Sequence, residues 1–321
     1  MATAIDIVTH WLSKYEKILI VIHQNPDGDT IASSLALSLG LNSIGKKAVV
    51  VSKDPVPAPF LFLPGIETIS RDYLQGDWDT IVVLDCGDLK RTGFSERIAD
   101  FAKDKKKLIN IDHHPKNDLH KIANINLFDE NAAAVGEIVI KIIDQLKIEL
   151  NKDIATCLLT ALYTDTGGFK HSNTSSQTLE LASRFMSDGA RLKNITKYIS
   201  NTKSISGLKL WGLVLSRIVY HPKTGLVTSV ITQKDLKKIG SLVDELAGAV
   251  NIIGNIPQAK GSLLLTELPD NQIKVSMRME NGDINILKLA RFLGGGGHKK
   301  ASGFTISGKI FNKAGKWSII D

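Results

Sequence analysis

The sequence of 321 residues has few cysteines and no long apolar run. Its two cysteines, Cys86 and Cys157, each lie inside an apolar segment, which excludes a disulfide framework and a cysteine zinc site. Apolar runs such as ILIVI are far shorter than the ~20 residues that a bilayer span needs. The N-terminal segment MATAIDIVTHWLSK lacks the basic start and apolar middle of a signal peptide. We therefore expect a cytoplasmic protein without membrane association.

Acidic residues are scarce in the last third of the chain. Residues 1–205 contain 24 basic and 25 acidic side chains, whereas residues 206–321 contain 16 basic and 8 acidic ones. The whole chain has a formal net charge of +7. This asymmetry favours an anionic ligand, a nucleotide or a nucleic acid, at the C-terminal part.

Short apolar runs alternate with helical patterns in the first ~190 residues, as in a parallel sheet covered by helices. Strands are predicted at residues 17–22, 47–51, 80–84 and 107–111, and helices at 30–43, 133–148 and 152–163. Four prolines between residues 55 and 64 indicate a loop. The prediction is an α/β fold in which residues 1–190 form a parallel-sheet domain with helices on both faces.

The C-terminal part has a different pattern. After the helix-like SQTLELASRFMSDGA, residues 191–206 are predicted to form a linker. Strands are predicted at 225–232, 261–268, 272–279 and 302–306, with helices near 241–253 and 284–293. Residues 207–321 should therefore form a smaller α/β domain with a mixed sheet.

Acidic and histidine residues follow the predicted strands at the points where the strands end. HQNPDGD begins at His23 after the first strand, Asp85 follows the third, and IDHH places Asp112, His113 and His114 at the fourth. Asp165 lies at the end of a helical run. Because the carboxyl ends of parallel strands meet at one edge of a sheet, these clusters should lie close together.

Each cluster alone has an ordinary explanation. NPDGD is a plausible turn, an aspartate at a strand end is usually a cap, adjacent histidines are often surface residues, and Asp-Thr-Gly-Gly normally ends a helix. Together, however, they would place several carboxylates within a few Å of one another, which is costly unless a cation compensates the repulsion. The combination predicts a metal centre.

The ligand types narrow the choice of metal. Two imidazoles and four carboxylates are candidates: His23, His113, Asp27, Asp29, Asp85 and Asp165. They exceed the ligand number of one tetrahedral zinc ion and indicate two ions. Mixed imidazole and carboxylate ligands favour Mn²⁺, with Mg²⁺ or Co²⁺ as alternatives. An EF-hand loop needs glycine at its sixth position, which counted from Asp27 is Ala32, so this motif is excluded. A phosphatase with an aspartyl nucleophile would have its aspartate directly after the strand, whereas four residues separate the strand from Asp27.

The run FLGGGGHKKASGF follows a helical pattern. Gly294 could simply end that helix, but four consecutive glycines exceed the need of a cap and favour close approach of backbone N–H groups to an anion. His298 and two lysines follow, which suits a phosphate or carboxylate pocket. Upstream, the alternation in IKVSMRM puts Arg278 on the polar face of a strand, where it could bind a phosphate or lie in solvent.

Five motifs carry a family resemblance. HQNPDGDTIASS, VVLDCGD, IDHH and LYTDTGGF resemble, in order and approximate spacing, the motifs of the DHH phosphoesterase superfamily. GGGGHKKASGF is similar to the glycine-rich motif of the DHH-associated C-terminal domain. TDTGGFKHSNTSSQTLELASRFMSDGA resembles the branch of nano-RNases, pAp phosphatases and cyclic-dinucleotide phosphodiesterase-like proteins.

The resemblance implies a two-Mn²⁺ hydrolase whose active site lies in the cleft between its domains, and dimers are common among such proteins. By motif position, the metal ligands are His23, Asp27, Asp29, Asp85, His113 and Asp165, with Asp85 and Asp165 bridging. His114 would contact the scissile phosphate, and Asp112 would orient a metal ligand without binding the metal itself. The substrate's terminal phosphate or nucleotide would be held by Arg278, Gly295, Gly296, Gly297 and His298. One departure is Ala32, where many relatives have glycine, which slightly narrows the approach to the metals.

The resulting hypothesis is hydrolysis of short RNA or DNA oligonucleotides, pAp, pApA or cyclic dinucleotides by a metal-bridging hydroxide. An inorganic pyrophosphatase is an alternative, although the GGGGH motif argues against it. The third hypothesis is a non-catalytic nucleotide-binding relative of such enzymes. It predicts the loss of one or more metal ligands, whereas all six candidate ligands are present in this chain.

Overall fold

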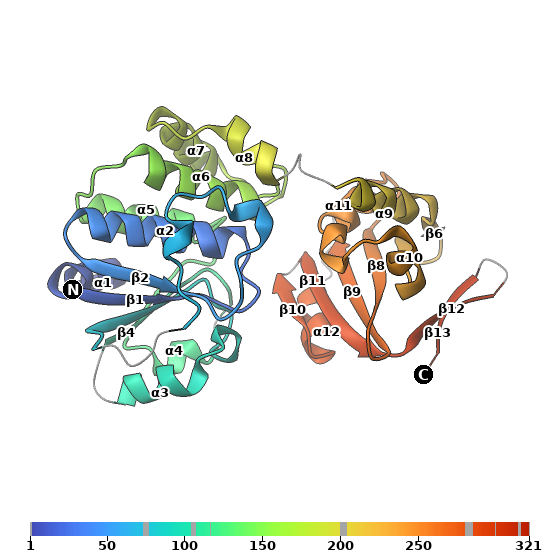
Figure 1. Cartoon of the computed structure of the whole chain (residues 1–321), viewed down its shortest axis with the longest axis horizontal. Coiled ribbons are helices and arrows are strands. Elements are labelled where there is room, and N and C mark those ends of the chain that lie inside the picture. The colour runs from blue at the N-terminus through green and yellow to red at the C-terminus, as the bar shows by residue number, and fades with distance from the viewer. Residues whose placement is uncertain are drawn as a thin grey trace. The chain divides into compact units, whose positions relative to one another are not determined.

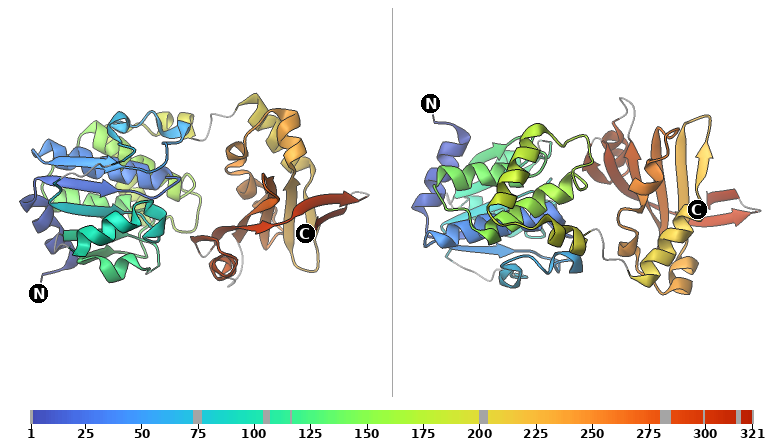
Figure 2. Two further views of the ribbon diagram at one scale, coloured as in Figure 1. Left: turned by 60° about the horizontal axis from the view of Figure 1, so that its bottom comes forward. Right: turned by 90° about the horizontal axis from the view of Figure 1, so that it is seen from above.

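The computed structural model of the protein describes residues 2–72, 77–103, 107–115, 117–199, 204–279, 285–298, 300–313 and 316–320. The chain divides into two compact units, Met1–Thr202 and Lys203–Asp321 (Figure 1). Each unit has its own sheet, as the additional views in Figure 2 show, and its own set of buried apolar residues. The predicted α/β class is therefore confirmed.

The first unit is built on a parallel sheet of five strands in the order β2-β1-β3-β4-β5. The strands are β1 (Lys17–Val21), β2 (Lys47–Val51), β3 (Thr80–Leu84), β4 (Lys107–Asp112) and β5 (Ile125–Phe128). The first four confirm the predicted strands, whereas β5 was not predicted. Since the central strands β1 and β3 are buried on both faces, they read as continuous apolar runs.

Helices cover both faces of this sheet (Figure 1). One face packs against α1 (Ala4–Lys14), α2 (Gly28–Ser43), α5 (Gly136–Gln145) and α6 (Lys152–Asp165), with α7 (Ser176–Ser187) on α6. The other face packs against α3 (Ser95–Lys103) and α4 (Leu119–Ile122). The proline-rich segment forms the short 3-10 turns Ala58–Phe60 and Ile66–Thr68, and a third turn spans Lys90–Thr92. Tight packing of α2 on α6 brings their ends, which carry acidic residues, to the same region.

The segment predicted as a linker, residues 191–206, is instead largely helical. Helix α8 (Leu192–Ile199) lies within it, and Ile195 is completely buried in the core of the first unit. Residues 200–203 lie outside the described residues, and α9 begins at Ile205. Polar residues on the outer face of α8 masked its amphipathic spacing in the sequence.

The second unit contains a mixed sheet in the order β10-β11-β9-β8-β7-β6. Its strands are β6 (Val219–His221), β7 (Leu226–Ile231), β8 (Gly261–Leu268), β9 (Gln272–Met279), β10 (Gly296–His298) and β11 (Ala301–Ser307). Among its described strands, β7 and β8 pair in parallel and the other neighbours pair antiparallel. The helices are α9 (Ile205–Ser216), α10 (Gln233–Ile239), α11 (Ala249–Gly254) and α12 (Ile286–Phe292), with a 3-10 turn at Val243–Leu246. A separate hairpin pairs β12 (Lys309–Lys313) with β13 (Lys316–Ile320). Among the described residues of both units, no helix is long and apolar enough to cross a membrane.

Candidate metal centre

Side chains from the strand ends of the first unit converge in three groups whose potential ligand atoms lie within 4.8 Å of one another. The groups are His23, Asp27 and Asp85; Asp85, His113 and His114; and Asp29, His113 and Asp165. All six predicted metal ligands therefore fall into a group, and His114 joins them. Asp85 and His113 each belong to two groups, so the three sets form one continuous cluster.

The turn after β1 presents the first two ligands. Asp27 caps the N-terminus of α2, while His23 is buried. The Nδ1 atom of His23 lies 2.6 Å from the backbone carbonyl of Gln24, which can only accept. Nδ1 therefore carries the proton, and in the neutral ring Nε2 keeps the lone pair that a metal ligand needs.

The hydroxyl of Thr30 lies at the centre of the first group, a position that the sequence analysis did not single out. Its Oγ1 atom is 2.8 Å from Nε2 of His23, 2.9 Å from Oδ1 of Asp27, and in hydrogen-bond contact with Oδ2 of Asp85. A short polar residue directly after an acidic motif residue is the only signal that the sequence offered.

Asp29 lies on the first turn of α2 and is fully buried. Ser33 Oγ donates to its carboxylate at 2.6 Å, and the backbone N–H groups of Val135 and Gly136, at the start of α5, donate at 2.6 Å and 3.3 Å. Burial and the charge of Asp85 nevertheless raise its pKa to about 7. The carboxylate is thus held in position, yet its charge is not fully compensated by protein groups.

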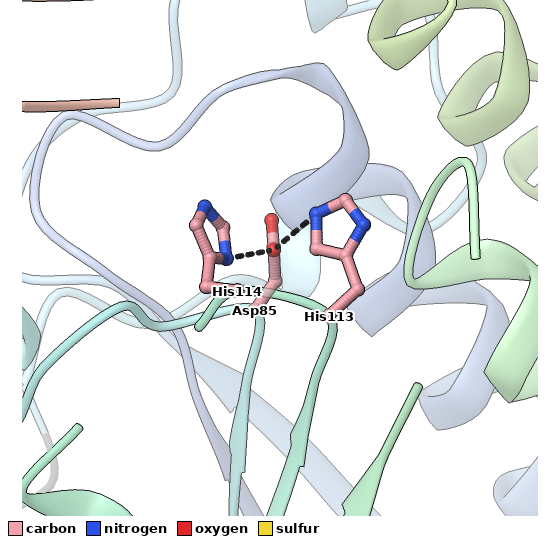
Figure 3. A group of neighbouring side chains, drawn as sticks. All are labelled: Asp85, His113 and His114. Atoms are coloured by element: carbon pink, nitrogen blue, oxygen red, sulfur yellow. Dashed lines mark ion pairs between the residues drawn. The ribbon is translucent and has the colours of Figure 1, made fainter. Parts of the chain in front are cut away.

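Asp85 directly follows β3 and has a left-handed backbone conformation, with a φ of 55°. Such a conformation is uncommon for residues other than glycine, and residues that adopt it cluster at functional sites. Its Oδ1 atom is buried without a hydrogen bond. Oδ1 lies 3.4 Å from Nδ1 of His114 and 3.7 Å from Nε2 of His113, the two contacts drawn in Figure 3. Burial raises the pKa of Asp85, but the surrounding histidines, His114 first, lower it to about 2.

Asp112, the last residue of β4, organises the two histidines that follow it. Its Oδ1 atom accepts from the backbone N–H of His113 at 2.8 Å, the backbone N–H of His114 at 3.0 Å and Nδ1 of His114 at 2.8 Å. Burial lowers the pKa of His114, but the bond to Asp112 and the charge of Asp85 outweigh it, and the pKa is raised. The Nδ1 atom of His113 donates a hydrogen bond to the backbone carbonyl of Ala132 at 3.0 Å, which directs Nε2 of this ring toward the cluster.

Asp165 ends helix α6 and completes the third group from the opposite side. Its Oδ2 atom lies 3.5 Å from Nε2 of His113. Burial raises its pKa well above the ordinary value, and the charges of Asp29, Asp27 and Asp85 raise it further. Two carboxyls with raised pKa values and an unbonded buried oxygen on Asp85 indicate a site whose negative charge needs a cation. The residues present therefore fit divalent metal ions.

The residues expected to bind substrate lie in the second unit. Burial alternates along β9 as predicted, and Arg278 lies on the less buried face. Ala301 of β11 pairs with Arg278 on one side and with His298 on the other, which brings these two positions into one row.

Close packing of β10 explains much of the glycine run. A Cβ atom on Gly295 would lie 2.1 Å from the carbonyl oxygen of Gly303, and one on Gly297 would lie 2.4 Å from that of Ala301. Gly294, with a φ of 76°, follows the end of α12, as its cap role predicts. A Cβ atom on Gly294 or on Gly296 would meet nothing within 4 Å, but the positive φ of Gly294 still favours glycine there. The anion-binding role of this run remains a prediction, since three of the four glycines have a structural reason.

Family models match both units of the chain. The N-terminal domain of the DHH family matches residues 17–162, and the DHHA1 domain matches residues 225–315. The first match spans the strands β1 to β5 and ends inside α6, close to Asp165.

Curated relatives and a solved structure extend over most of the chain. The bifunctional oligoribonuclease and PAP phosphatase NrnA of Thermus thermophilus is 32% identical over 300 residues, which are 92% of this chain and 86% of that protein. The protein of the same name from Bacillus subtilis is 27% identical over 92% of this chain and 91% of its own length. A crystal structure of an exopolyphosphatase-related protein from Bacteroides fragilis superposes with a TM-score of 0.85 at 30% identity, covering 94% of this chain and 90% of that one.

Proposed function

Since the chain belongs to the DHH family and is a phosphoesterase, we propose that it hydrolyses short oligoribonucleotides and pAp with two Mn²⁺ ions. The substrate classes come from the printed names of relatives that are 27% to 32% identical over most of the chain. The proposal for Mn²⁺ comes from the mixture of imidazole and carboxylate groups.

The position of Asp85 carries this proposal. It belongs to two of the three candidate groups, and His113 links the second group to the third. A carboxylate shared between neighbouring groups is the arrangement expected of a bridging ligand in a two-metal site. Bound ions would make a water molecule nucleophilic at neutral pH and neutralise charge on the phosphoryl oxygens.

His114 is the proposed contact to the scissile phosphate. Because Asp112 holds Nδ1 at 2.8 Å, any proton that His114 exchanges with a phosphate ester is carried at Nε2. Asp112 also fixes the ring through the backbone N–H groups of His113 and His114, which limits its rotation. This arrangement suits a group that stabilises or protonates the leaving oxygen.

The second unit is proposed to hold the far end of the substrate. Arg278 and His298 share one cross-strand row, and a Cβ atom on Gly296, two residues before His298, would meet nothing within 4 Å. An arginine in such a position can bind a terminal phosphate through two parallel N–H bonds. The excess of 16 basic over 8 acidic residues in 206–321 supports an anionic substrate.

A substrate panel tests the function. The purified protein is incubated with Mn²⁺ and pAp, pApA, di- to pentanucleotides, cyclic dinucleotides or pyrophosphate, and products are separated by chromatography. We expect turnover of pAp and of the shortest oligonucleotides. Turnover of pyrophosphate alone would replace the proposal by the pyrophosphatase alternative.

Two variants connect the activity to the cluster. Asp85→Asn should abolish turnover, since it removes the charge shared by two ligand groups. Asp100→Asn is the matched control, because Asp100 is an exposed carboxylate on α3 that pairs with Lys103 at 3.0 Å. If Asp85→Asn kept the wild-type Mn²⁺-dependent rate, the catalytic centre would lie elsewhere.

A further inference from the structure

Thr30 lies where three candidate metal ligands meet, and its side chain is fully buried. It occupies the first turn of α2, one residue after Asp29. Its Oγ1 atom contacts His23, Asp27 and Asp85, which form one of the three groups able to hold an ion.

One hydroxyl cannot satisfy these three neighbours. It donates a single proton, while the carboxylate oxygens of Asp27 and Asp85 can only accept when ionised. Nε2 of His23 is also an acceptor in the neutral ring, because Nδ1 faces the carbonyl of Gln24 at 2.6 Å. Asp27 also accepts the backbone N–H of Thr30 at 3.1 Å, and its side chain is 61% exposed, whereas His23 and Asp85 are buried. If the hydroxyl donates its one proton to Asp85, Nε2 of His23 keeps a lone pair that an ion at this group could use.

The contact between Thr30 and Asp85 determines which oxygen of the Asp85 carboxylate is available to an ion. Thr30 is bonded to Oδ2 of Asp85, and the other oxygen, Oδ1, is buried without a hydrogen bond. Oδ1 is the oxygen that lies near the two histidines His113 and His114. The hydroxyl thus fixes the rotation of the carboxylate that two candidate groups share.

We propose that Thr30 is a positioning residue for the metal centre: its hydroxyl bonds Oδ2 of Asp85 and so orients the other carboxylate oxygen, Oδ1, which raises the affinity of the site for its ions. The inference rests on the proposed metal-dependent function. Groups that orient metal ligands commonly contribute 10- to 100-fold in metal affinity.

Mn²⁺ binding to the full-length protein tests the proposal without measuring activity. Metal-free wild type, Thr30→Val and Thr30→Ser are titrated with Mn²⁺, and the free ion is followed by electron paramagnetic resonance. Thr30→Val keeps the branched shape and removes the hydroxyl, and we expect about a tenfold weaker affinity at one or both sites. Thr30→Ser keeps the hydroxyl and should stay within about threefold of wild type.

Thr160→Val is the control for loss of a buried helical hydroxyl. Thr160 is also fully buried, on α6, and its Oγ1 donates to the carbonyl of Thr156 at 2.8 Å. This variant should bind Mn²⁺ as wild type does. Thermal unfolding of all metal-free variants shows whether each is folded at the titration temperature.

The outcomes separate the two proposals. If wild type binds Mn²⁺ and Thr30→Val binds it equally well, the role of Thr30 is refuted while the metal centre stands. Equal weakening by Thr30→Ser and Thr30→Val would also refute it, because the hydroxyl would then not be the cause. A wild-type protein that takes up no Mn²⁺ would refute the metal-dependent function, and the role of Thr30 with it.

Discussion

Replacing Asp112 by asparagine should lower kcat while leaving Mn²⁺ binding intact. Asp112 is absent from the three candidate ligand groups found among the described residues. Its Oδ1 atom nevertheless accepts three hydrogen bonds, two from backbone N–H groups and one from the ring of His114. The asparagine oxygen can keep all three, so the substitution removes the negative charge and preserves the shape.

The expected decrease in kcat follows from the loss of negative charge on the oxygen that accepts the hydrogen bond of His114. A hydrogen bond to a charged group contributes about 1.5–3 kcal/mol, against about 0.5–1.5 kcal/mol for a neutral pair. The bond to His114 should therefore weaken by roughly 1–1.5 kcal/mol, which corresponds to about a tenfold lower kcat if the ring gains charge in the transition state. Stability should also fall by about 1–3 kcal/mol, because the new NH₂ group takes the place of the buried, unbonded Oδ2.

The assay compares kcat and KM for pAp hydrolysis with Mn²⁺ titrations of the same preparations. Asp100→Asn serves again as the control, because its carboxylate is exposed on α3. An unchanged kcat in Asp112→Asn would refute the role of Asp112 in orienting His114. Lost Mn²⁺ binding with a folded protein would instead show that Asp112 supports the ions directly.

Three further predictions follow from the structure. Gly136→Ala should lower the free energy of unfolding by about 1–3 kcal/mol in chemical denaturation, because its Cβ would lie 2.8 Å from that of Ala161 on α6. In chelator, the stability of wild type should fall as pH rises from about 4 to about 7, by about 1.4 kcal/mol per pH unit for each net proton. Asp29 has a pKa of about 7, and the pKa of Asp165 is also raised, so both carboxyls keep protons in the folded state that the unfolded chain has released. Mn²⁺ should remove this decline in stability. A flat stability profile in chelator would contradict the prediction. Gly296→Ala should leave folding unchanged, because its Cβ would meet nothing within 4 Å, yet raise KM for pAp if the backbone there contacts phosphate; an unchanged KM would remove this glycine from the substrate site.

The sequence predicted the elements whose signal is local. Strands β1 to β4 are apolar runs of five or six residues, and α2 and α6 have continuous apolar patterns. The structure differs where the signal is weak or lies elsewhere in the chain. Helix α8 was read as a linker because its apolar residues are interrupted by lysine, asparagine and threonine, although Ile195 anchors it in the first core. Strand β5, with four half-buried residues, gave no clear apolar run.

The sequence by itself determined which side chains reach the candidate centre. Each lies at or just after a strand end or at a helix end, and a parallel sheet brings such ends to one edge whatever the details of packing. Only the tertiary structure decided how they are arranged. The order β2-β1-β3-β4-β5 places Asp85 next to the histidines after β4, and α5 brings the N–H of Val135 to the carboxylate of Asp29, 106 residues away. Hydrogen bonds of this kind, including those of the Thr30 hydroxyl, depend on distances between segments remote in sequence, which no local pattern encodes.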